Sequence, residues 1–276
     1  MSDSVVLYEV RDDGVAVITL NRPDRMNAWT HELDELYFAT LQKANADTNV
    51  RAVVVTGSGR GFSAGADMEI LQGLDGERPP TALSPKTGRP LPFKHLQHEV
   101  LSVNKPVIAA INGAAAGMSL VQALLCDVRF AAAGAKFTFA FSQRGLAAEY
   151  GASWILPRIV GVSTALDLLF SSRVILAEEA KELGIVQRVV PGDQLLEEAI
   201  AYAANLAANC APRSMAVIKR QVYRHIGMEM QDAMDETFEV MVDLITGPDF
   251  KEGVASFVEK RSPNFNPVGA DFDPGI

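Results

Sequence analysis

The sequence predicts an α/β fold whose core alternates strands with helices. Short apolar segments typical of buried strands alternate with longer segments in which apolar residues recur at helical spacing. Two of the apolar segments, residues 52–56 and 107–111, each lead directly into a turn of small residues. After about residue 195 the strand segments stop, and only helical patterns follow.

Local signals justify the elements in chain order. An Asp-Asp-Gly turn at residues 12–14 joins two strands, Thr30 is a candidate N-cap, and Gly184 ends a helix. The predicted strands are 5–8, 15–20, 52–56, 107–111, 128–132, 136–139 and 185–190. The predicted helices are 30–46, 65–71, 95–102, 117–125, 177–183, 193–209, 212–226, 229–246 and 248–260. Residues 73–92, rich in Gly and Pro, are expected to form a mobile loop.

Length and charge narrow the class of protein. The 276 residues allow one sizeable core with an appendage, which we place at residues 1–194 and 195–276. The formal net charge of −9 argues against nucleic acid and anionic membranes as partners. The N-terminus lacks the features of a signal peptide, and Cys126 and Cys210 lie in apolar surroundings, as expected for reduced cysteines in a cytoplasmic protein. The uncharged segment 106–126 is interrupted by proline, glycine and amide residues, which favours a buried strand, turn and helix over a membrane span.

The two small-residue turns are the most informative motifs. They read GFSAGADM at residues 61–68 and NGAAAGM at residues 112–118. A strand that breaks into a small-residue turn and then a helix exposes unpaired backbone N–H groups at the helix start. Two such ends that face each other bind one carbonyl oxygen from both sides, which is the arrangement of an oxyanion hole.

Several short motifs extend this pattern along the chain. They are NRPDRMNA at 21–28, FSAGAD at 62–67, AAING at 109–113, CD at 126–127 and FVEKR at 257–261. In this order and spacing they resemble the crotonase superfamily, the enoyl-CoA hydratases and isomerases, over nearly the whole chain. The resemblance implies a core of stacked β-β-α units and a C-terminal helical region that covers the active site and builds trimers or a dimer of trimers. It also implies an acyl-CoA substrate, with coenzyme A as part of the substrate and no prosthetic group.

The resemblance places the two oxyanion-hole N–H donors at Ala66 and Met118. A thioester oxygen held by both makes the neighbouring α-proton acidic, because the enolate charge is stabilised as it develops. The family commonly has three glycines where this chain has Gly117, Met118 and Ser119. The Met118 side chain therefore enters space that glycine leaves empty, which bears on the acyl specificity.

The acidic residues suggest which reaction follows. By resemblance, the two glutamates that hold water in hydratases fall at Val121 and Phe141, and neither side chain moves a proton. The segment GLAAEYG at 145–151 instead resembles the turn that carries a single catalytic aspartate in dienoyl-CoA isomerases and in the phenylacetate-pathway isomerase. Here the acid is Glu149. Val121, Phe141 and Tyr150 are expected to line the substrate pocket, and Tyr150 either supports the acid or the substrate or is packed with its hydroxyl satisfied.

A CoA site is also implied by the resemblance. Its candidates are Arg25, Asn27 and Ala28 in the loop around the nucleotide, Ala64, Asp67 and Met68 on the adenine side, and Phe257 and Lys260 on a C-terminal helix that sometimes comes from the next subunit. A cation on a flexible stem suits a phosphate. The four histidines lack metal-ligand spacing, so no metal site is expected, and no ATP or NAD motif occurs.

Three functions fit these residues. The first is isomerisation of an enoyl-CoA or dienoyl-CoA double bond with Glu149 as the proton shuttle. The second is an enoyl-CoA hydratase of fatty-acid oxidation with a displaced acid. The third is an acyl-CoA-binding protein that has lost catalysis, against which Glu149 argues.

Overall fold

The computed structural model describes residues 4–72, 82–83, 90–91 and 93–275. Its largest sheet has six strands in the order β1-β2-β3-β7-β9-β12. These strands are β1 Val6–Val10, β2 Val15–Leu20, β3 Ala52–Gly57, β7 Val107–Ile111, β9 Val128–Ala132 and β12 Arg188–Val190. The first two form an antiparallel hairpin and every other pair in the sheet is parallel.

A second, smaller sheet has the order β11-β10-β8-β4. Its strands are β4 Gly61–Ser63, β8 Ala114–Ala116, β10 Lys136–Thr138 and β11 Ile175–Leu176. Strands β3, β7 and β9 of the large sheet lead in turn into β4, β8 and β10 of the small one, so the chain repeats one layered unit. This stacking confirms the predicted α/β core. A two-stranded sheet, β5 Ala82–Leu83 with β6 Pro90–Leu91, stands apart from both.

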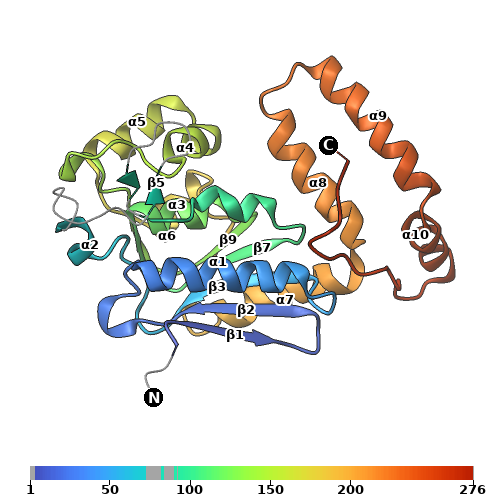
Figure 1. Cartoon of the computed structure of the whole chain (residues 1–276), viewed down its shortest axis with the longest axis horizontal. Coiled ribbons are helices and arrows are strands. Elements are labelled where there is room, and N and C mark those ends of the chain that lie inside the picture. Colours follow the sequence, from blue (N-terminus) through green and yellow to red (C-terminus); the bar gives the residue numbers. More distant parts are fainter. Residues whose placement is uncertain (1–3, 73–81, 84–89, 92, 276) are drawn as a thin grey trace.

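Helices pack on the large sheet, whose central strands β2, β3, β7 and β9 are buried along almost their whole length. Helix α1, His31–Ala46, packs against β1 and β2, and helix α7, Leu195–Asn209, packs against β3 and β7 (Figure 1). Thr30 is the N-cap of α1, as predicted, since its hydroxyl accepts a hydrogen bond from the Leu33 N–H at 3.2 Å. The remaining helices of the core are α2 Met68–Gln72, α3 Gly117–Leu125, α4 Ala152–Val160, α5 Val162–Ser171 and α6 Ala177–Glu182, with short 3₁₀ helices at Pro23–Arg25, Gln97–Ser102 and Ser142–Arg144.

The C-terminal helices extend away from the sheet as an arm. They are α8 Pro212–His225, α9 Met230–Thr246 and α10 Pro248–Glu259, and Figure 1 shows α9 and α10 on the far side of α8 from the core. A buried lysine holds α8 to the core, because Lys219 Nζ donates to Asp127 Oδ2 at 2.9 Å and to the carbonyls of Val100 and Lys105 at 3.3 Å. The first helix of the arm, α8, is therefore attached to the core by these hydrogen bonds.

Several details differ from the sequence predictions. Strands β4, β8 and β11 were not predicted, and the strand predicted at residues 185–190 is β12, Arg188–Val190. The predicted helix at 95–102 is a 3₁₀ helix that begins at Gln97, and the helix predicted from residue 65 begins at Met68. Helices α4 and α5 were not predicted, since Pro157 lies inside the first and Gly161 separates the two. Most of the predicted loop 73–92 lies outside the described residues. Within the described part of the chain, no helix combines the length and apolar character that crossing a membrane requires.

Candidate active site

The two small-residue turns lie against each other at one edge of the small sheet. Strands β4 and β8 pair in parallel, with Gly61 opposite Ala114 and Ser63 opposite Ala115, so their carboxyl ends meet. Gly65 adopts a φ of +91°, and a Cβ atom there would lie 2.9 Å from the carbonyl oxygen of Ala116. The contact between the turns therefore requires glycine at position 65.

Each turn presents a backbone N–H group without a hydrogen-bond acceptor. Within the part of the chain that the structure describes, the N–H groups of Ala66 and Met118 donate to no backbone or side-chain atom. The amides on either side of Ala66 behave differently, because Asp67 donates to the Trp29 carbonyl at 2.9 Å and Gly65 lies 3.5 Å from the Ser63 hydroxyl. Met118 lies in the first turn of α3, where helical geometry leaves N–H groups free. Two free donors on touching turns are suited to bind one carbonyl oxygen.

The loop before α1 clamps the first turn. The Trp29 N–H donates to the Gly65 carbonyl at 2.8 Å, and the Trp29 carbonyl accepts from Asp67. Arg22 Nη1 forms an ion pair with Asp67 Oδ2 at 3.0 Å in a largely buried environment. Partial burial alone raises the pKa of Asp67, but hydrogen bonds from the Glu69 N–H and from Arg22 outweigh it, so the pKa lies below its ordinary value. Asp67 is therefore a charged structural anchor of the turn.

Glu149 is one of the residues that line the same cavity. Glu149 stands in the turn between Arg144 and α4, and its side chain is half-buried. Burial raises the pKa of the carboxyl above its ordinary value. In the described part of the chain, its carboxylate has neither a salt bridge nor a hydrogen bond. An unpaired carboxyl with a raised pKa is suited to accept and return a proton.

Tyr150 follows directly, with its backbone in the left-handed region at a φ of +55°. Burial, together with the charges of Glu149 and Asp34, raises the pKa of its hydroxyl, so the phenol keeps its proton. Its side chain lines the cavity next to Glu149.

The cavity has a volume of about 460 Å³ and mostly apolar walls. Besides Glu149, its lining includes the apolar residues Phe93, Met118, Phe139, Phe141, Leu146 and the aromatic Tyr150. The charged residues Asp24, Arg25 and Arg144 also contribute to the lining and are exposed to solvent. A hydrophobic acyl group would find one half-buried carboxyl within otherwise apolar surroundings.

Most of the predicted site residues meet at this cavity. Those that line it are Glu149, Ala66, Met118, Arg25, Ala28, Ala64, Asp67, Met68, Phe141 and Tyr150. Val121 does not line it, because this side chain of α3 faces the core and is fully buried. Asn27 is also fully buried, and its amide is used by the Arg22 N–H and by the carbonyls of Ser58 and Gly61 at 2.8 to 2.9 Å. Its side chain thus holds the loop together and does not face the cavity.

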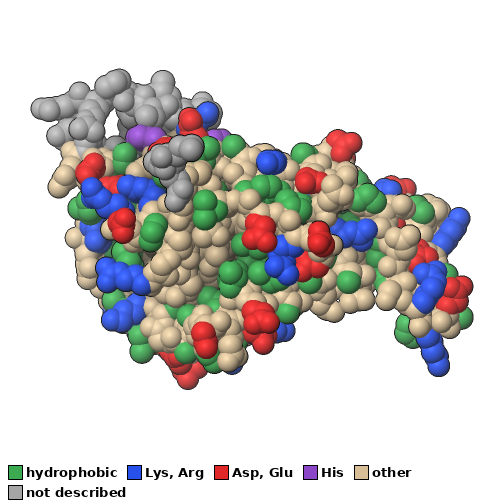
Figure 2. Space-filling model, turned by 90° about the horizontal axis from the view of Figure 1, so that it is seen from below, with side chains coloured by type: hydrophobic (Ala, Val, Ile, Leu, Met, Phe, Trp, Pro, Cys, Tyr) green, Lys and Arg blue, Asp and Glu red, His purple; other side chains and the backbone are tan. Residues whose placement is uncertain are grey.

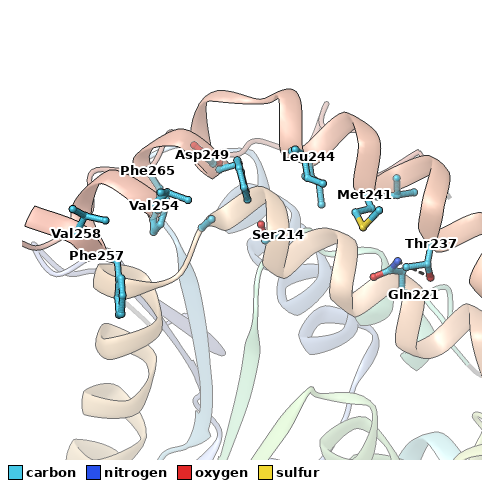
Figure 3. A pocket seen from close by; sticks show the side chains of 15 residues that line it. Ser214, Gln221, Thr237, Met241, Leu244, Asp249, Val254, Phe257, Val258 and Phe265 are labelled. Atoms are coloured by element: carbon cyan, nitrogen blue, oxygen red, sulfur yellow. Dashed lines mark hydrogen bonds between the residues drawn. The ribbon is translucent and has the colours of Figure 1, made fainter. Parts of the chain in front are cut away.

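The two predicted residues of the last helix lie elsewhere in a single chain. Phe257 is 86% exposed and lines a second, apolar groove between α8, α9 and α10 (Figure 3). Lys260 is the C-cap residue of α10. Contact of either residue with the cavity would require a neighbouring subunit, and their CoA-binding role stays a prediction.

Phe139, Leu146 and Phe93 are cavity residues that the sequence predictions missed. Phe139 follows β10, which pairs with β8 and ends at the same edge as the two turns, so the repeated strand-and-turn unit is the signal that would have found it. Leu146 lies in the segment that contains Glu149, whereas Phe93 lies in no recognisable motif.

Comparison with known proteins identifies the family. The model of the family described as enoyl-CoA hydratase/isomerase matches residues 10–267. A probable enoyl-CoA hydratase of Mycobacterium bovis is 36% identical over 273 residues, covering 95% of this chain and 93% of the relative. The 1,2-epoxyphenylacetyl-CoA isomerase of Escherichia coli is 33% identical over 264 residues, covering 92% and 95%. The chain therefore belongs to the enoyl-CoA hydratase/isomerase family of crotonase-fold enzymes.

Solved structures agree with this assignment. A putative enoyl-CoA hydratase of Streptomyces coelicolor superposes with a TM-score of 0.85 at 32% identity, with 96% of each chain covered. An enoyl-CoA hydratase of Mycobacterium marinum is 49% identical, with a TM-score of 0.68 over 80% of this chain and 98% of that one. Relatives are named both hydratase and isomerase, so their names leave the reaction open.

Proposed function

We propose that this protein moves a carbon–carbon double bond within an unsaturated acyl-CoA thioester, with Glu149 as its single proton shuttle. The observation that carries the proposal is the state of the cavity carboxyls. Among the described residues of the cavity, Glu149 is the carboxyl that is half-buried, unpaired and raised in pKa. Asp67 is held in an ion pair with Arg22, and Asp24 is exposed to solvent.

The proposed mechanism uses the two free amides as the oxyanion hole. The N–H groups of Ala66 and Met118 donate to the thioester oxygen and stabilise the negative charge that develops there. Glu149 removes a proton from an activated carbon of the acyl chain, and the charge spreads from the oxygen over the conjugated carbons. The same carboxyl then returns the proton two carbons away, so that the double bond moves and no atom is gained or lost.

Apolar residues favour isomerisation over addition of water. By resemblance, hydratases place glutamates where this chain has Val121 and Phe141, and Phe141 lines the cavity. Water addition needs a water molecule held and activated beside the double bond, and the mainly apolar wall offers few groups for it. Hydration by Glu149 alone is the alternative that the experiment below separates.

The CoA site and the assembly belong to the same proposal. Arg25 is exposed on the lining of the cavity, where a cation suits the phosphates of CoA. The arm of α8 to α10 carries large exposed apolar side chains, including Phe257 and Val258 at 86% and 72% exposure. A homotrimer or dimer of trimers would cover them and bring Lys260 of one chain to the CoA site of the next.

Figure 2 shows acidic and basic side chains interspersed on one face, which agrees with a small-molecule substrate in place of nucleic acid. A cytoplasmic location completes the proposal, with Cys126 and Cys210 both free.

The test is to incubate the purified protein with 2-enoyl-, 3-enoyl- and dienoyl-CoA thioesters in deuterium oxide. Mass spectrometry and proton NMR then identify the products. Isomerisation changes the position of the double bond and exchanges deuterium into the acyl chain without adding oxygen. A 3-hydroxyacyl-CoA product would show hydration instead, and tight binding without conversion of any thioester would overturn the proposed catalysis.

A further inference from the structure

A buried pair of hydroxyl groups connects the two turns of the cavity. The Oγ atoms of Ser63 and Ser119 lie 2.6 Å apart, and both residues are fully buried. Ser63 Oγ also donates to the carbonyl oxygen of Asn27 at 2.7 Å. Since a serine hydroxyl has one proton, Ser119 is the donor to Ser63. The hydrogen bonds therefore run in one direction, from Ser119 to Ser63 and on to Asn27.

This link lies where the backbone pairing between the turns stops. The register of β4 and β8 shifts between Gly61 and Ser63, and the ladder ends where Ser63 lies opposite Ala115. Within the described chain, no backbone hydrogen bond joins residues 64–67 to residues 117–119. Beyond the end of this ladder, the side-chain hydrogen bond between Ser63 and Ser119 joins the first turn to the start of α3.

The serines stand close in sequence to the two free amides. Ser119 directly follows Met118 in the first turn of α3, and Ser63 precedes Ala66 by three residues. The end of the hydrogen-bond chain is rigid, because the Asn27 side chain is itself bonded to the carbonyls of Ser58 and Gly61. A shift of α3 relative to the first turn would therefore stretch the serine pair and change the separation of the two N–H donors.

We propose that Ser63 and Ser119 are positioning residues that set the spacing of the Ala66 and Met118 N–H groups, so that both reach one thioester oxygen. The inference rests on the proposed function, because it assumes that these amides form the oxyanion hole. The serines act through the backbone and do not line the cavity. Small displacements of groups that stabilise a transition state lower the rate strongly while leaving the affinity for substrate nearly unchanged.

The two single variants differ in what they leave unpaired. In Ser119→Ala, Ser63 still donates to Asn27, so no buried polar group loses its only partner. In Ser63→Ala, the Ser119 hydroxyl and the Asn27 carbonyl both lose their partner, and the protein loses more stability. Ser119→Ala is therefore the cleaner test. Thr56→Val is the matched control, because it removes a buried hydroxyl that donates to the Ala110 carbonyl at 2.9 Å between β3 and β7, outside both turns.

The test uses an aryl-acryloyl-CoA as a chromophoric probe. Its absorption shifts to the red when donors polarise the thioester carbonyl, so the shift reports the two amides without any turnover. We expect wild type and Thr56→Val to give the full red shift, and Ser119→Ala to give a smaller one with the dissociation constant for the probe within about twofold. In turnover with the thioester that the incubation above identifies as a substrate, kcat of Ser119→Ala should fall about tenfold at unchanged KM. The double variant should lose little more than the worse single variant.

The outcomes separate this inference from the proposed function. An undiminished red shift and unchanged kcat in Ser119→Ala would overturn the positioning role while leaving the oxyanion hole intact. Absence of a red shift in the wild-type complex would overturn both. An equal loss of red shift in Thr56→Val would show a general effect of buried hydroxyls and would also overturn the positioning role.

Discussion

Glu149→Gln is the substitution that most directly tests the proposed chemistry. Glutamine keeps the size and shape of glutamate but cannot accept a proton from carbon. Positioned general acid–base groups contribute about 10²- to 10⁴-fold to a rate. Because Asp67 is tied to Arg22 and Asp24 is exposed, neither is placed to substitute. We therefore expect a loss toward the upper end, about 10³- to 10⁴-fold in kcat, or roughly 4 to 5.5 kcal/mol of transition-state stabilisation.

The raised pKa of Glu149 predicts two opposite effects of rising pH, a gain in catalytic rate and a loss of folding stability. Only the ionised carboxylate removes a proton, so wild-type kcat/KM should rise as pH rises through this raised pKa, and the residual rate of Glu149→Gln should lack that step. The folded state holds the Glu149 proton more tightly than the unfolded chain, so charging this carboxyl destabilises the fold as pH rises through the same window. Glu149→Gln should then be more stable than wild type near neutral pH, and the difference should disappear below the unfolded pKa of about 4.3.

Isomerase turnover, CoA affinity and urea midpoints at several pH values measure these effects together. Glu149→Asp is the matched control, since it keeps the carboxyl one methylene shorter and should retain part of the rate. Full turnover by Glu149→Gln with unchanged CoA affinity would refute the reasoning. A lower stability of that variant at neutral pH would refute the view that Glu149 is a desolvated, unpaired carboxyl.

Three other predictions concern the frame of the site and the assembly. Lys219→Met should lower the free energy of unfolding by about 3 kcal/mol, because it leaves the partly buried Asp127 carboxylate without its cation, and an unchanged urea midpoint would contradict this. Asp67→Asn should lower the free energy of unfolding by about 1–3 kcal/mol near neutral pH, because it leaves Arg22 without its ion-pair partner. Since the pKa of Asp67 is lowered in the folded state, this difference in stability from wild type should shrink as pH falls through that pKa. A difference in stability that does not depend on pH would count against the ion pair. Phe257→Asp should reduce the assembly mass in light scattering, whereas a mass equal to that of wild type would argue against an interface at α10.

The parts of the fold that depend on local chemistry were predictable from residues close in sequence. Thr30, a typical N-cap residue, correctly predicted the start of α1. Continuous apolar segments predicted the buried strands β3 and β7. The prediction failed where the signal was short or ambiguous. Helix α4 contains Pro157 and α5 begins directly after Gly161, and proline and glycine are signals that normally interrupt a helix.

For the site, the sequence indicated which residues to consider but not how each is used. Asn27 and Asp67 were both predicted to bind CoA. The Asn27 side chain is instead fully buried and hydrogen-bonded to backbone carbonyls, whereas Asp67 lines the cavity and is held in an ion pair with Arg22. Val121 and Phe141 were both assigned to the pocket, and only Phe141 faces it. Which way a side chain points depends on neighbours far away in the chain, and a residue pattern does not contain them.

The sequence by itself determined the α/β class, the two glycine- and alanine-rich turns and Glu149 as the candidate acid. Only the tertiary structure decided that the turns touch at Gly65, that Ser63 and Ser119 join them, and that the Glu149 carboxyl is half-buried without a partner. The reason is physical. Strand and turn preferences arise within a few consecutive residues, whereas contact and burial arise only when β4 and β8, some fifty residues apart in the chain, pair side by side.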